Sequence, residues 1–453
     1  MAEPSLDRSI PLVAALAATL GSLVVALVQA GWARLHRPAG DLKDPLRILF
    51  LVAGACSCGG DRAPPRPPPA ETLGISVTTG CPPLPPIVGF IHRDDAILLN
   101  TAMAPFRGTG SNLYYMQQLL AYAQQDHDPK LLAAISEVLD DFVCLSLPIA
   151  RIWGFNDTPD RSAIRSGPHD FQEAGLRGLD QAVWEAKRRG IRLIIPLVNN
   201  WADYGGLPAY AAWASKEDGA TYSHDDFFFD PRMRQWWKDY VSMLAERVNV
   251  YTGVAYRDEP AILAWEVANE LRCAACRGTT RVADTVAELA DVLRREMPHH
   301  LIADGGEGFD DDPAPYFGLS NDYPVRGAEG SSFSQLAALP ELDMVSYHYY
   351  PKTYGLGSVR DTQIWIQRHQ AIATAYGKVA YLGECGYEAS DAERASSYDA
   401  WLRHLFDESG GPIGLMWQLI PNARLASDTF AVHSRTDRAT AYILSSWGTA
   451  LMR

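Results

Sequence analysis

Short apolar runs alternate with amphipathic segments from residue 87 to the end of the chain. We interpret the runs as strands buried on both faces, and the segments, whose apolar positions recur every three or four residues, as helices. Eight strands alternating with helices predict an α/β fold made of a single closed (β/α)8 TIM barrel. A doubly wound open sheet is the alternative, but no glycine-rich phosphate loop follows the first strand. The predicted strands are 106–110, 143–149, 192–198, 261–267, 301–303, 344–347, 379–382 and 413–417.

Helix-start and helix-stop residues locate several of the predicted helices. Asp170 is expected to be the N-cap of one helix, and Gly190 is expected to end it. Asp230 and Pro231 predict the start of another helix, whose apolar stripe continues from Met233 to Tyr251. The remaining helices are predicted near 131–139, 282–296, 360–376, 391–407 and 437–450.

Polar side chains follow the predicted strands at their carboxyl ends. Glu270 comes directly after the strand 261–267, and Glu384 follows the strand 379–382. The carboxyl ends of the strands in a parallel barrel meet at one face, which is where such barrels carry out catalysis. Two glutamates at that face suit hydrolysis of a glycosidic bond, which needs a proton donor and a nucleophile or base. The same face is predicted to gather Arg151, Asn199, Asn200, Trp201, Asn269, His348, Tyr350 and Trp417.

The first 86 residues are predicted to lie outside the barrel. Residues 1–58 form a hydrophobic export or membrane-anchor segment, because residues 10–32 carry no charge and are long enough to cross a bilayer. A buried helix of a soluble domain is the alternative. A second apolar run ends at Cys56 and resembles a bacterial lipoprotein signal, so Cys56 is a candidate for lipidation. Residues 59–86 are rich in proline and are predicted to be an extended linker. The protein is therefore expected to be exported, either as a cell-surface lipoprotein or membrane-anchored, or alternatively secreted.

The net charge narrows the classes of binding partner, and the cysteine content indicates the cellular compartment. The net charge of −14 argues against nucleic acid, whose phosphates are bound by basic surfaces, and suits a neutral substrate. Seven cysteines fit an oxidising compartment. Cys273 and Cys276 are predicted to form a loop disulfide, since no second CxxC or histidine pair completes a zinc site. Cys144, expected inside a strand, and Cys385 are expected to be packed thiols.

The motifs from residue 87 onward resemble those of the endo-β-1,4-mannanases of glycoside hydrolase family 5, in the clan A of retaining barrel enzymes. They occur in the family's order and include GTGSNLYY (108–115), ARIWGFND (150–157), PLVNNWADYGG (196–206), DDFFFDP (225–231), AILAWEVANELRC (261–273), GGEGF (305–309), SYHYYP (346–351), YLGECGY (381–387) and GLMWQL (414–419). The resemblance implies that residues 87–453 are a glycoside hydrolase catalytic domain.

Site roles are carried over from these motifs. The resemblance implies that Glu270 is the general acid/base and Glu384 the nucleophile of a retaining mechanism. Arg151 would keep Glu384 ionised, and Tyr350 would donate a hydrogen bond to the same carboxylate. The other side chains implied to bind substrate or shape the site are Trp153, Asn200, Trp201, Asn269, Arg272, His348 and Trp417.

Each of these side chains has an expected place. Asn269 would contact the sugar 2-hydroxyl, and His348 would orient the site. Trp417 would form the floor of the cleavage subsite, and Trp201 would extend that aromatic platform. Arg272 would lie on the leaving-group side.

Three functions follow from the sequence. The first is an exported retaining endo-β-1,4-mannanase acting on mannan, glucomannan or galactomannan, or a related plant polysaccharide. The second is a β-1,4-glucanase or another clan A β-glycosidase with the same mechanism. The third is a surface glycan-binding protein that has lost turnover. No cofactor or metal is expected, because a carboxylic acid supplies the proton. Residues 310–312 are expected to form a solvated acidic loop rather than to bind an ion, and the chain is expected to be a monomer.

Overall fold

The computed structural model describes residues 80–420 and 428–452 of the chain. The predicted export or anchor segment 1–58, with Cys56, lies outside the described residues, as does the part of the predicted linker from 59 to 79. Within the described part of the chain, no helix combines the length and apolarity needed to cross a bilayer.

Eight parallel strands form a closed barrel, as the apolar runs predict. Each strand pairs with its neighbour in the barrel order, and the last strand closes onto the first through pairs from Ile413–Gly108 to Met416–Ser111. The strands are β3 (Gly108–Asn112), β4 (Ile149–Arg151), β7 (Arg192–Pro196), β8 (Ile262–Glu266), β9 (Leu301–Ala303), β10 (Met344–Tyr349), β11 (Val379–Cys385) and β12 (Ile413–Met416).

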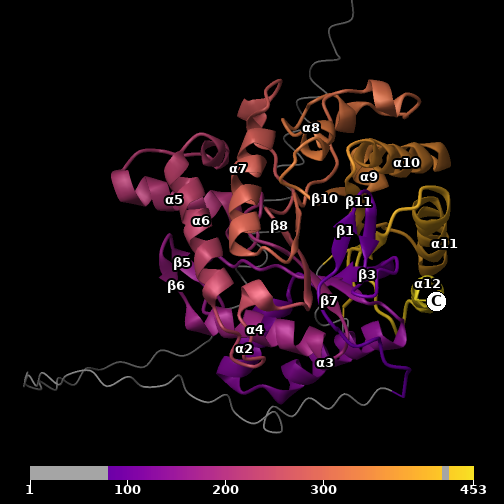
Figure 1. Ribbon diagram of the computed structural model, residues 1–453, viewed down its shortest axis with the longest axis horizontal. Coiled ribbons are helices and arrows are strands. Elements are labelled where there is room, and N and C mark those ends of the chain that lie inside the picture. The colour runs from indigo at the N-terminus through magenta and orange to yellow at the C-terminus, as the bar shows by residue number, and fades with distance from the viewer. Residues whose placement is uncertain (1–79, 421–427, 453) are drawn as a thin grey trace, which may run out of the picture. The chain divides into compact units, whose positions relative to one another are not determined.

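Helices surround the strands, as Figure 1 shows. They follow the strands in the sequence, and the buried apolar residues of most of them contribute to the core between the strands and the helices. They are α2 (Met116–Asp126), α3 (Pro129–Cys144), α4 (Glu173–Lys187), α5 (Gly206–Asp218), α6 (Pro231–Glu246), α7 (Arg281–Glu296), α8 (Phe333–Ala337), α9 (Pro351–Tyr354), α10 (Val359–Ala375), α11 (Asp391–Arg403) and α12 (Arg438–Leu451).

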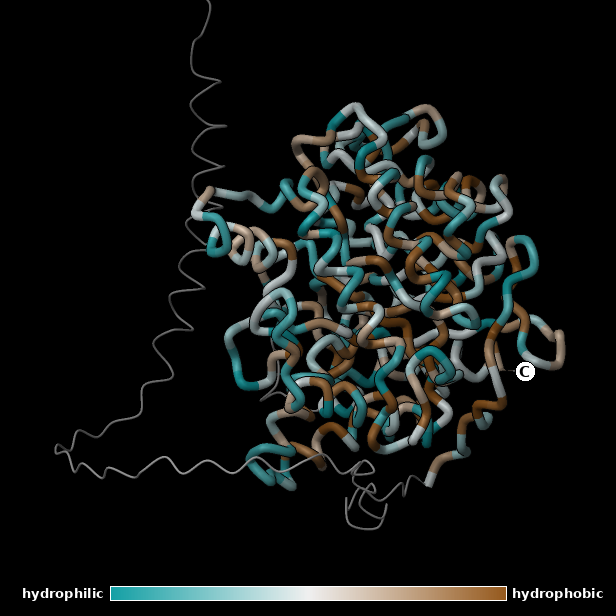
Figure 2. Tube along the Cα trace, turned by 60° about the vertical axis from the view of Figure 1, so that its left-hand side comes forward, coloured by the Kyte–Doolittle hydropathy of each residue, from teal (hydrophilic) through white to brown (hydrophobic). Residues whose placement is uncertain are grey.

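The hydrophobic core has two parts. The larger part lies between the strands and the helices, and hydrophobic segments of the trace run through the interior in Figure 2. The smaller part fills the barrel and includes Ile149, Ile194 and Tyr381. A hairpin of β1 (His92–Asp94) and β2 (Ile97–Leu99) contributes Leu98 to this inner core. A second small hairpin consists of β5 (Arg165–Gly167) and β6 (Asp170–Phe171).

The predicted strand 143–149 is wrong in its first half. Val143 and Cys144 end α3, which Asp128 caps by accepting hydrogen bonds from two backbone N–H groups. The helix pattern of Ile135, Val138 and Leu139 continues into Val143, so its side chain belongs to the same buried face. The strand begins only at Ile149, after Pro148.

Two further helix boundaries differ from prediction. Asp170 pairs in β6 rather than capping a helix, and Gln172 occupies the N-cap position of α4. Asp230 does cap α6, with its Oδ1 2.8 Å from the N–H of Arg232. That helix ends at Glu246, however, and Val248 beyond it is exposed rather than part of the apolar stripe.

Two disulfides cross-link the described residues. Cys81 is bonded to Cys144, so the expectation that Cys144 is a packed thiol is wrong, and the bond fastens residues near 81 to the end of α3. Cys273 is bonded to Cys276 in the loop after β8. Cys385 is a buried free thiol within β11.

Candidate active site

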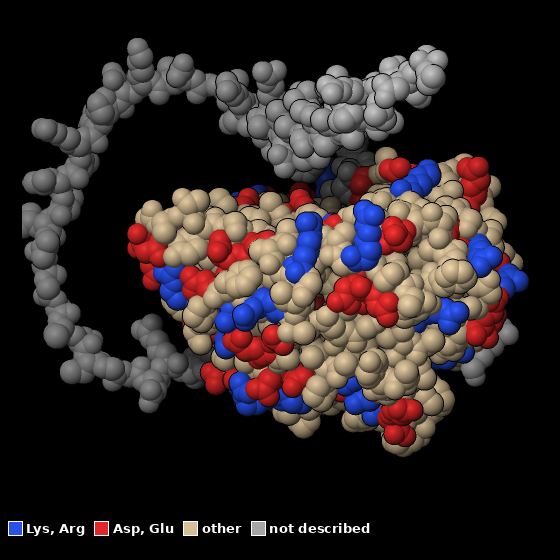
Figure 3. All heavy atoms as spheres, turned by 90° about the horizontal axis from the view of Figure 1, so that it is seen from above, with Lys and Arg blue, Asp and Glu red and all other residues tan. Residues whose placement is uncertain are grey.

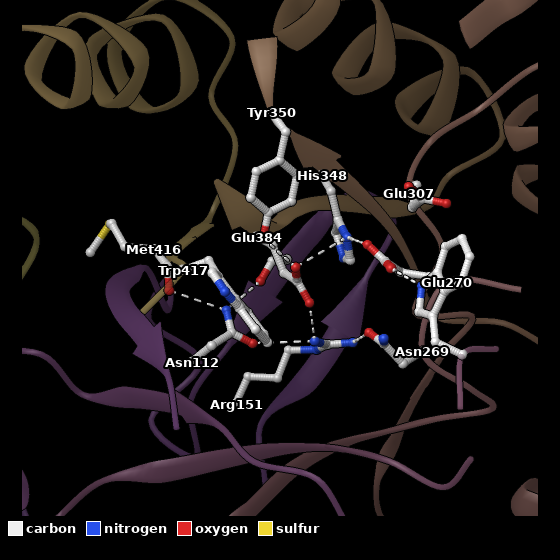
Figure 4. A network of polar contacts seen from close by, with 12 residues as sticks. Asn112, Arg151, Asn269, Glu270, Glu307, His348, Tyr350, Glu384, Met416 and Trp417 are labelled. Carbon is white, nitrogen blue, oxygen red and sulfur yellow. Dashed lines mark hydrogen bonds and ion pairs between the residues drawn. The ribbon is translucent and has the colours of Figure 1, made fainter. Parts of the chain in front are cut away.

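The carboxyl ends of β8, β10 and β11 bring Glu270, His348 and Glu384 together. Nδ1 of His348 lies 2.7 Å from Oε1 of Glu270 and 3.6 Å from Oε2 of Glu384. One oxygen of each carboxylate and a ring nitrogen of the histidine all lie within 4.8 Å of one another. Figure 4 shows the imidazole between the two carboxylates. A retaining glycosidase holds its two carboxyl groups about 5–5.5 Å apart, and this spacing fits that geometry.

Strand register explains how His348 reaches this position. The pairing of β10 with β11 shifts by one residue after Tyr347, so that His348 lies opposite Glu384. Such bulges are common next to active sites, because they redirect a side chain without ending the strand. The bulge therefore turns His348 toward both glutamates.

Glu384 accepts two short hydrogen bonds from fixed donors. Nη1 of Arg151 lies 2.7 Å from Oε1, and the hydroxyl of Tyr350 lies 2.6 Å from Oε2. Both donors favour the ionised carboxylate. Burial raises the pKa of Glu384 to about 7 and the charge of Glu270 adds to the rise, whereas His348, Arg151 and Tyr350 oppose it.

Arg151 is held by a second carboxylate, Glu266, which the sequence pattern did not single out. Nε of Arg151 lies 2.9 Å from both Oε1 and Oε2 of Glu266, and Nη2 lies 2.6 Å from Oε2. Tyr381 donates a further hydrogen bond of 2.6 Å to Glu266. Both Arg151 and Glu266 are fully buried. Burial alone lowers the pKa of Arg151, but Glu266 and Glu384 outweigh it and raise that pKa above its usual value.

Glycine at position 305 leaves the space that Glu266 occupies. Gly305 has φ +77°, and a Cβ built there would come within 2.0 Å of the Ala268 carbonyl oxygen and 2.8 Å of Oε2 of Glu266. Only glycine tolerates both this backbone conformation and this approach. The GGEGF motif thus provides the clearance for the buried carboxylate.

Glu270 lies at the rim of the site with its backbone in the left-handed region. Its φ is +58°, an uncommon value for a residue other than glycine, and such strain concentrates at functional sites. Nε1 of Trp201 donates a hydrogen bond of 2.6 Å to Oε2. Burial raises the pKa of Glu270, while this hydrogen bond and the nearby arginines oppose the rise. Its carboxyl group therefore keeps a proton at higher pH than an exposed glutamate does.

Burial lowers the pKa of His348 below its ordinary value, although the neighbouring carboxylates, Glu384 first, oppose the change. Its Nδ1 faces both carboxylates, while Nε2 is buried without a hydrogen-bond partner among the described residues. The imidazole fixes the orientation of Glu270 through one short contact.

A cavity of about 490 Å³ opens over the two glutamates. Aromatic rings form one wall, where Tyr114 stacks on Trp417 with centroids 5.2 Å apart and Trp153 packs beside both. Aromatic faces of this kind pack well against the apolar face of a sugar ring. Nε1 of Trp417 donates to Oδ2 of Asp428 at 2.9 Å, which fixes the plane of the indole. Trp201, 39% exposed, extends the aromatic surface on the Glu270 side.

Arg272 and Glu307 form a pair on the far side of Glu270. Nε and Nη2 of Arg272 lie 2.6 and 2.7 Å from the two oxygens of Glu307, and the guanidinium lies 4.8 Å from the ring centre of Trp201. Burial and the charge of Glu270 raise the pKa of Glu307 to about 7, and Arg272 opposes that rise. The pair presents a polar surface next to the acid.

Most of the predicted site residues line the cavity, and three do not. The cavity wall includes Trp153, Trp201, Asn269, Glu270, Arg272, Tyr350, Glu384 and Trp417. Arg151 and His348 are buried directly behind the glutamates. Asn200 is also buried, and it accepts hydrogen bonds from the backbone of Arg272 and from His224, so it holds the loop rather than facing the cavity.

Sequence reasoning missed several residues that complete the site. Glu266 lies inside an apolar run, and Glu307 lies in a glycine-rich loop. At each position the only signal in the sequence was an acidic residue where a surface residue was not expected. Tyr354, Asp428 and Phe430 line the cavity from segments that carry no periodic pattern.

The prediction that residues 310–312 form a solvated acidic loop is wrong for the first of them. Asp310 is fully buried and accepts hydrogen bonds from Ser332 and Ser334, which anchors the start of α8. Within the described residues, the one trio of potential metal ligands is Glu270, His348 and Glu384, already described.

The face shown in Figure 3 carries basic and acidic side chains interspersed with uncharged ones. It therefore presents no extended basic surface of the kind that binds nucleic acid.

Comparison with known proteins identifies relatives over most of the described chain. A family model described as GH family 5 beta-mannosidase-like matches residues 89–378. The mannan endo-1,4-beta-mannosidase 8 of Oryza sativa subsp. japonica is 31% identical over 76% of this chain and 94% of its own length. The endo-beta-1,4-mannanase from Thermotoga petrophila has a similar structure, with a TM-score of 0.66 and 31% identity over 76% of this chain and 77% of that one. For a 36% identical relative from Arabidopsis thaliana, the match spans 63% of that protein.

Proposed function

The chain belongs to the β-mannosidase-like members of glycoside hydrolase family 5, and from this membership and the geometry of the site we propose that it is a retaining endo-β-1,4-mannanase. Its substrates are mannan, glucomannan or galactomannan. The observation that carries the proposal is the approach of Glu270 and Glu384 to within 4.8 Å across one cavity. This separation leaves no room for a water molecule between nucleophile and sugar, so the second carboxylate itself attacks.

In the first step, a carboxylate oxygen of Glu384 attacks the anomeric carbon and forms a covalent glycosyl–enzyme. The bond to the leaving sugar breaks, and Glu270 gives its proton to the departing oxygen. Tyr350 and Arg151 hold the Glu384 carboxylate in one orientation, which limits the entropy lost in reaching the transition state.

The pair of glutamates shares one proton near neutral pH, because two carboxylates this close do not both ionise readily. The proton resides on Glu270, since Glu384 alone lies in direct contact with a permanently charged guanidinium. The acid and the nucleophile are thereby assigned by their environments rather than by residue type.

In the second step, Glu270, now ionised, removes a proton from water as that water attacks the anomeric carbon. Glu384 leaves as a carboxylate, and the sugar is released with its original β configuration. Asn269 supports both steps. Its Oδ1 is held by Nη2 of Arg151 at 2.7 Å and its Nδ2 by Asn199 at 3.0 Å, so the amide is fixed at the cavity wall where a sugar 2-hydroxyl can bind.

Substrate choice is tested by initial rates on polymers. We expect reducing ends to appear from glucomannan and unbranched mannan, and little or no release from carboxymethylcellulose. A higher rate on carboxymethylcellulose would assign the chain to the β-1,4-glucanases instead. Binding of mannan with no product after long incubation would identify a glycan-binding protein without turnover.

Export and surface attachment belong to the proposal as well. Two disulfides in the described residues support an oxidising compartment, where such bonds persist. The chain is held at the cell surface either as a lipoprotein acylated at Cys56 or through the hydrophobic segment 1–58, with secretion as the alternative, and the catalytic domain acts as a monomer beyond the proline-rich linker. Metabolic labelling with palmitate, compared between the wild type and Cys56→Ser, tests the lipid, and size-exclusion chromatography with light scattering tests the monomer.

A further inference from the structure

A second cavity, of about 290 Å³, lies at the opposite end of the barrel from the glutamates. It is bounded by the segment before β1, the turn after β2 and the end of α12, and Arg192 at the first position of β7 faces it. The lining residues are mostly apolar and include Pro85, Val88, Ile91, Pro105, Phe106 and Leu451. The disulfide between Cys81 and Cys144 fastens the segment that forms one wall.

Arg192 is buried in this wall without a carboxylate partner. It is 8% exposed, and its one hydrogen bond joins Nη1 to the carbonyl oxygen of Pro260 at 2.7 Å. Among the described residues Arg192 forms no ion pair, and burial, with no contribution from a neighbouring carboxylate, accounts for the shift of its pKa. Burial lowers the pKa of Arg192 to about 10, so the guanidinium remains charged at neutral pH.

The other buried arginines among the described residues are paired with carboxylates. Arg151 is paired with Glu266, Arg165 with Asp157 at 2.8 Å, and Arg189 with Glu185. Burying an unpaired charge is costly, and proteins usually supply a counter-ion or a bound ligand. Arg192 is therefore the exception that requires an explanation.

A second arginine lines the same cavity. Arg107 donates to the carbonyl oxygens of Phe406 and Gly411, while its Nε is buried with no hydrogen-bond partner. Burial lowers the pKa of Arg107, and Asp407, which forms no ion pair with it, partly opposes that change. Two guanidinium groups thus supply donors to a cavity whose other walls are largely apolar.

We propose that this cavity binds a small organic carboxylate with an apolar body. The carboxylate accepts hydrogen bonds from Arg192 and Arg107, since guanidinium groups bind carboxylates in a planar, charge-assisted geometry. The apolar body packs against the proline and phenylalanine walls, with the ring of Phe106 already beneath the Arg192 guanidinium at 5.8 Å. The volume limits the ligand to roughly the size of a single substituted ring. This site is separate from the glutamates and does not depend on the proposed hydrolysis.

Titration calorimetry on the full chain tests the site with benzoate as the probe. Benzamide serves as the matched neutral ligand, and inorganic phosphate as an anion without an apolar body. We expect saturable binding of benzoate, at least ten-fold weaker binding in Arg192→Met, and unchanged binding in Arg403→Met, which removes an exposed arginine elsewhere. Mannan hydrolysis should be the same in all three proteins.

Several results would overturn the proposal. Equal affinity for benzamide would show that charge plays no part, and binding of phosphate alone would show a simple anion site. Loss of mannan hydrolysis upon benzoate addition would place the ligand in the catalytic cavity. If Arg192→Met does not fold, Arg107→Met replaces it, because Arg107 is only partly buried, and benzoate binding that is unchanged in that variant would also refute the site.

Discussion

Arg151 uses Nε and Nη2 to bind Glu266, which leaves Nη1 directed at the carboxylate of Glu384. The guanidinium is planar, so fixing one edge on Glu266 fixes the direction of the remaining N–H groups. Asn112 accepts a further hydrogen bond from Nη1 at 3.2 Å. The position of the proposed nucleophile is thus set by a fully buried carboxylate on β8, a strand that is adjacent neither to β4 nor to β11 in the barrel.

Glu266→Gln should slow catalysis without unfolding the protein. The amide keeps the shape of Glu266 but removes the charge that anchors Arg151, and a small displacement of a catalytic group costs up to about 100-fold in kcat. Without the negative charge of Glu266, the positive charge of Arg151 acts more strongly on Glu384 and lowers its pKa. The acidic limb of the pH profile should therefore move to lower pH. Glu217→Gln, at an exposed ion pair, is the matched control. An unchanged pH profile would show that Glu266 serves only stability.

The two limbs of the pH profile should respond to two different hydrogen-bond donors. Activity needs Glu384 ionised and Glu270 protonated, so the rate falls at low pH as Glu384 gains a proton and at high pH as Glu270 loses one. Tyr350→Phe removes a donor to ionised Glu384, raises its pKa and should shift the acidic limb upward. Trp201→Phe removes a donor to Glu270, raises its pKa and should extend activity to higher pH. Profiles of kcat/KM in which both variants move the same limb would contradict the assignment.

Loss of the two glutamates should have different consequences. Glu384→Ala should abolish hydrolysis of every substrate, because no covalent intermediate can form. Glu270→Ala should abolish hydrolysis of mannan but still release dinitrophenolate rapidly from a dinitrophenyl β-mannoside, since that leaving group needs no proton. A burst of dinitrophenolate followed by a slow steady state is the expected trace. The opposite behaviour of the two variants would exchange their roles.

Asp304, at the end of β9, should make stability depend on pH. Burial raises its pKa to about 7, so the folded state holds this proton more tightly than the unfolded state does. The contribution of Asp304 to the unfolding free energy is therefore greatest at low pH and declines between about pH 4 and pH 7. The Asp304→Asn variant has no ionisable group at this position. Between pH 5 and pH 8, the unfolding free energy of the wild type should therefore fall by about 2–3 kcal/mol more than that of the variant. Urea unfolding measures this difference. Asp322→Asn, at an exposed position, should match the wild type.

The barrel could be predicted from sequence because strands covered on both faces appear as continuous apolar runs, such as Leu193 to Ile195. The prediction of a strand over 143–149 is wrong in its first half because the buried face of a helix and a short strand give the same apolar signal until Pro148 separates them. Glu270 and Glu384 stood out because they follow their strands directly.

Residues whose partners lie far away in the sequence gave no such signal. Glu266 appears as one acidic residue in an apolar run, and its reason for being there is Arg151, 115 positions earlier. The unpaired charge of Arg192 was equally hidden, since only the folded chain shows that no carboxylate reaches it. Patterns in sequence identify which strand ends matter, whereas the network behind them becomes visible only in the folded structure.

The central claim is that Glu270 and Glu384 carry out hydrolysis with retention, and proton NMR of a fresh digest tests it most directly. When the enzyme is added to mannohexaose, the β-anomer of the new reducing end should appear first, and the α-anomer should grow only as mutarotation proceeds. An α-anomer that appears first would mean a single displacement by water, which requires carboxyl groups about 6.5–9.5 Å apart and contradicts the site described here.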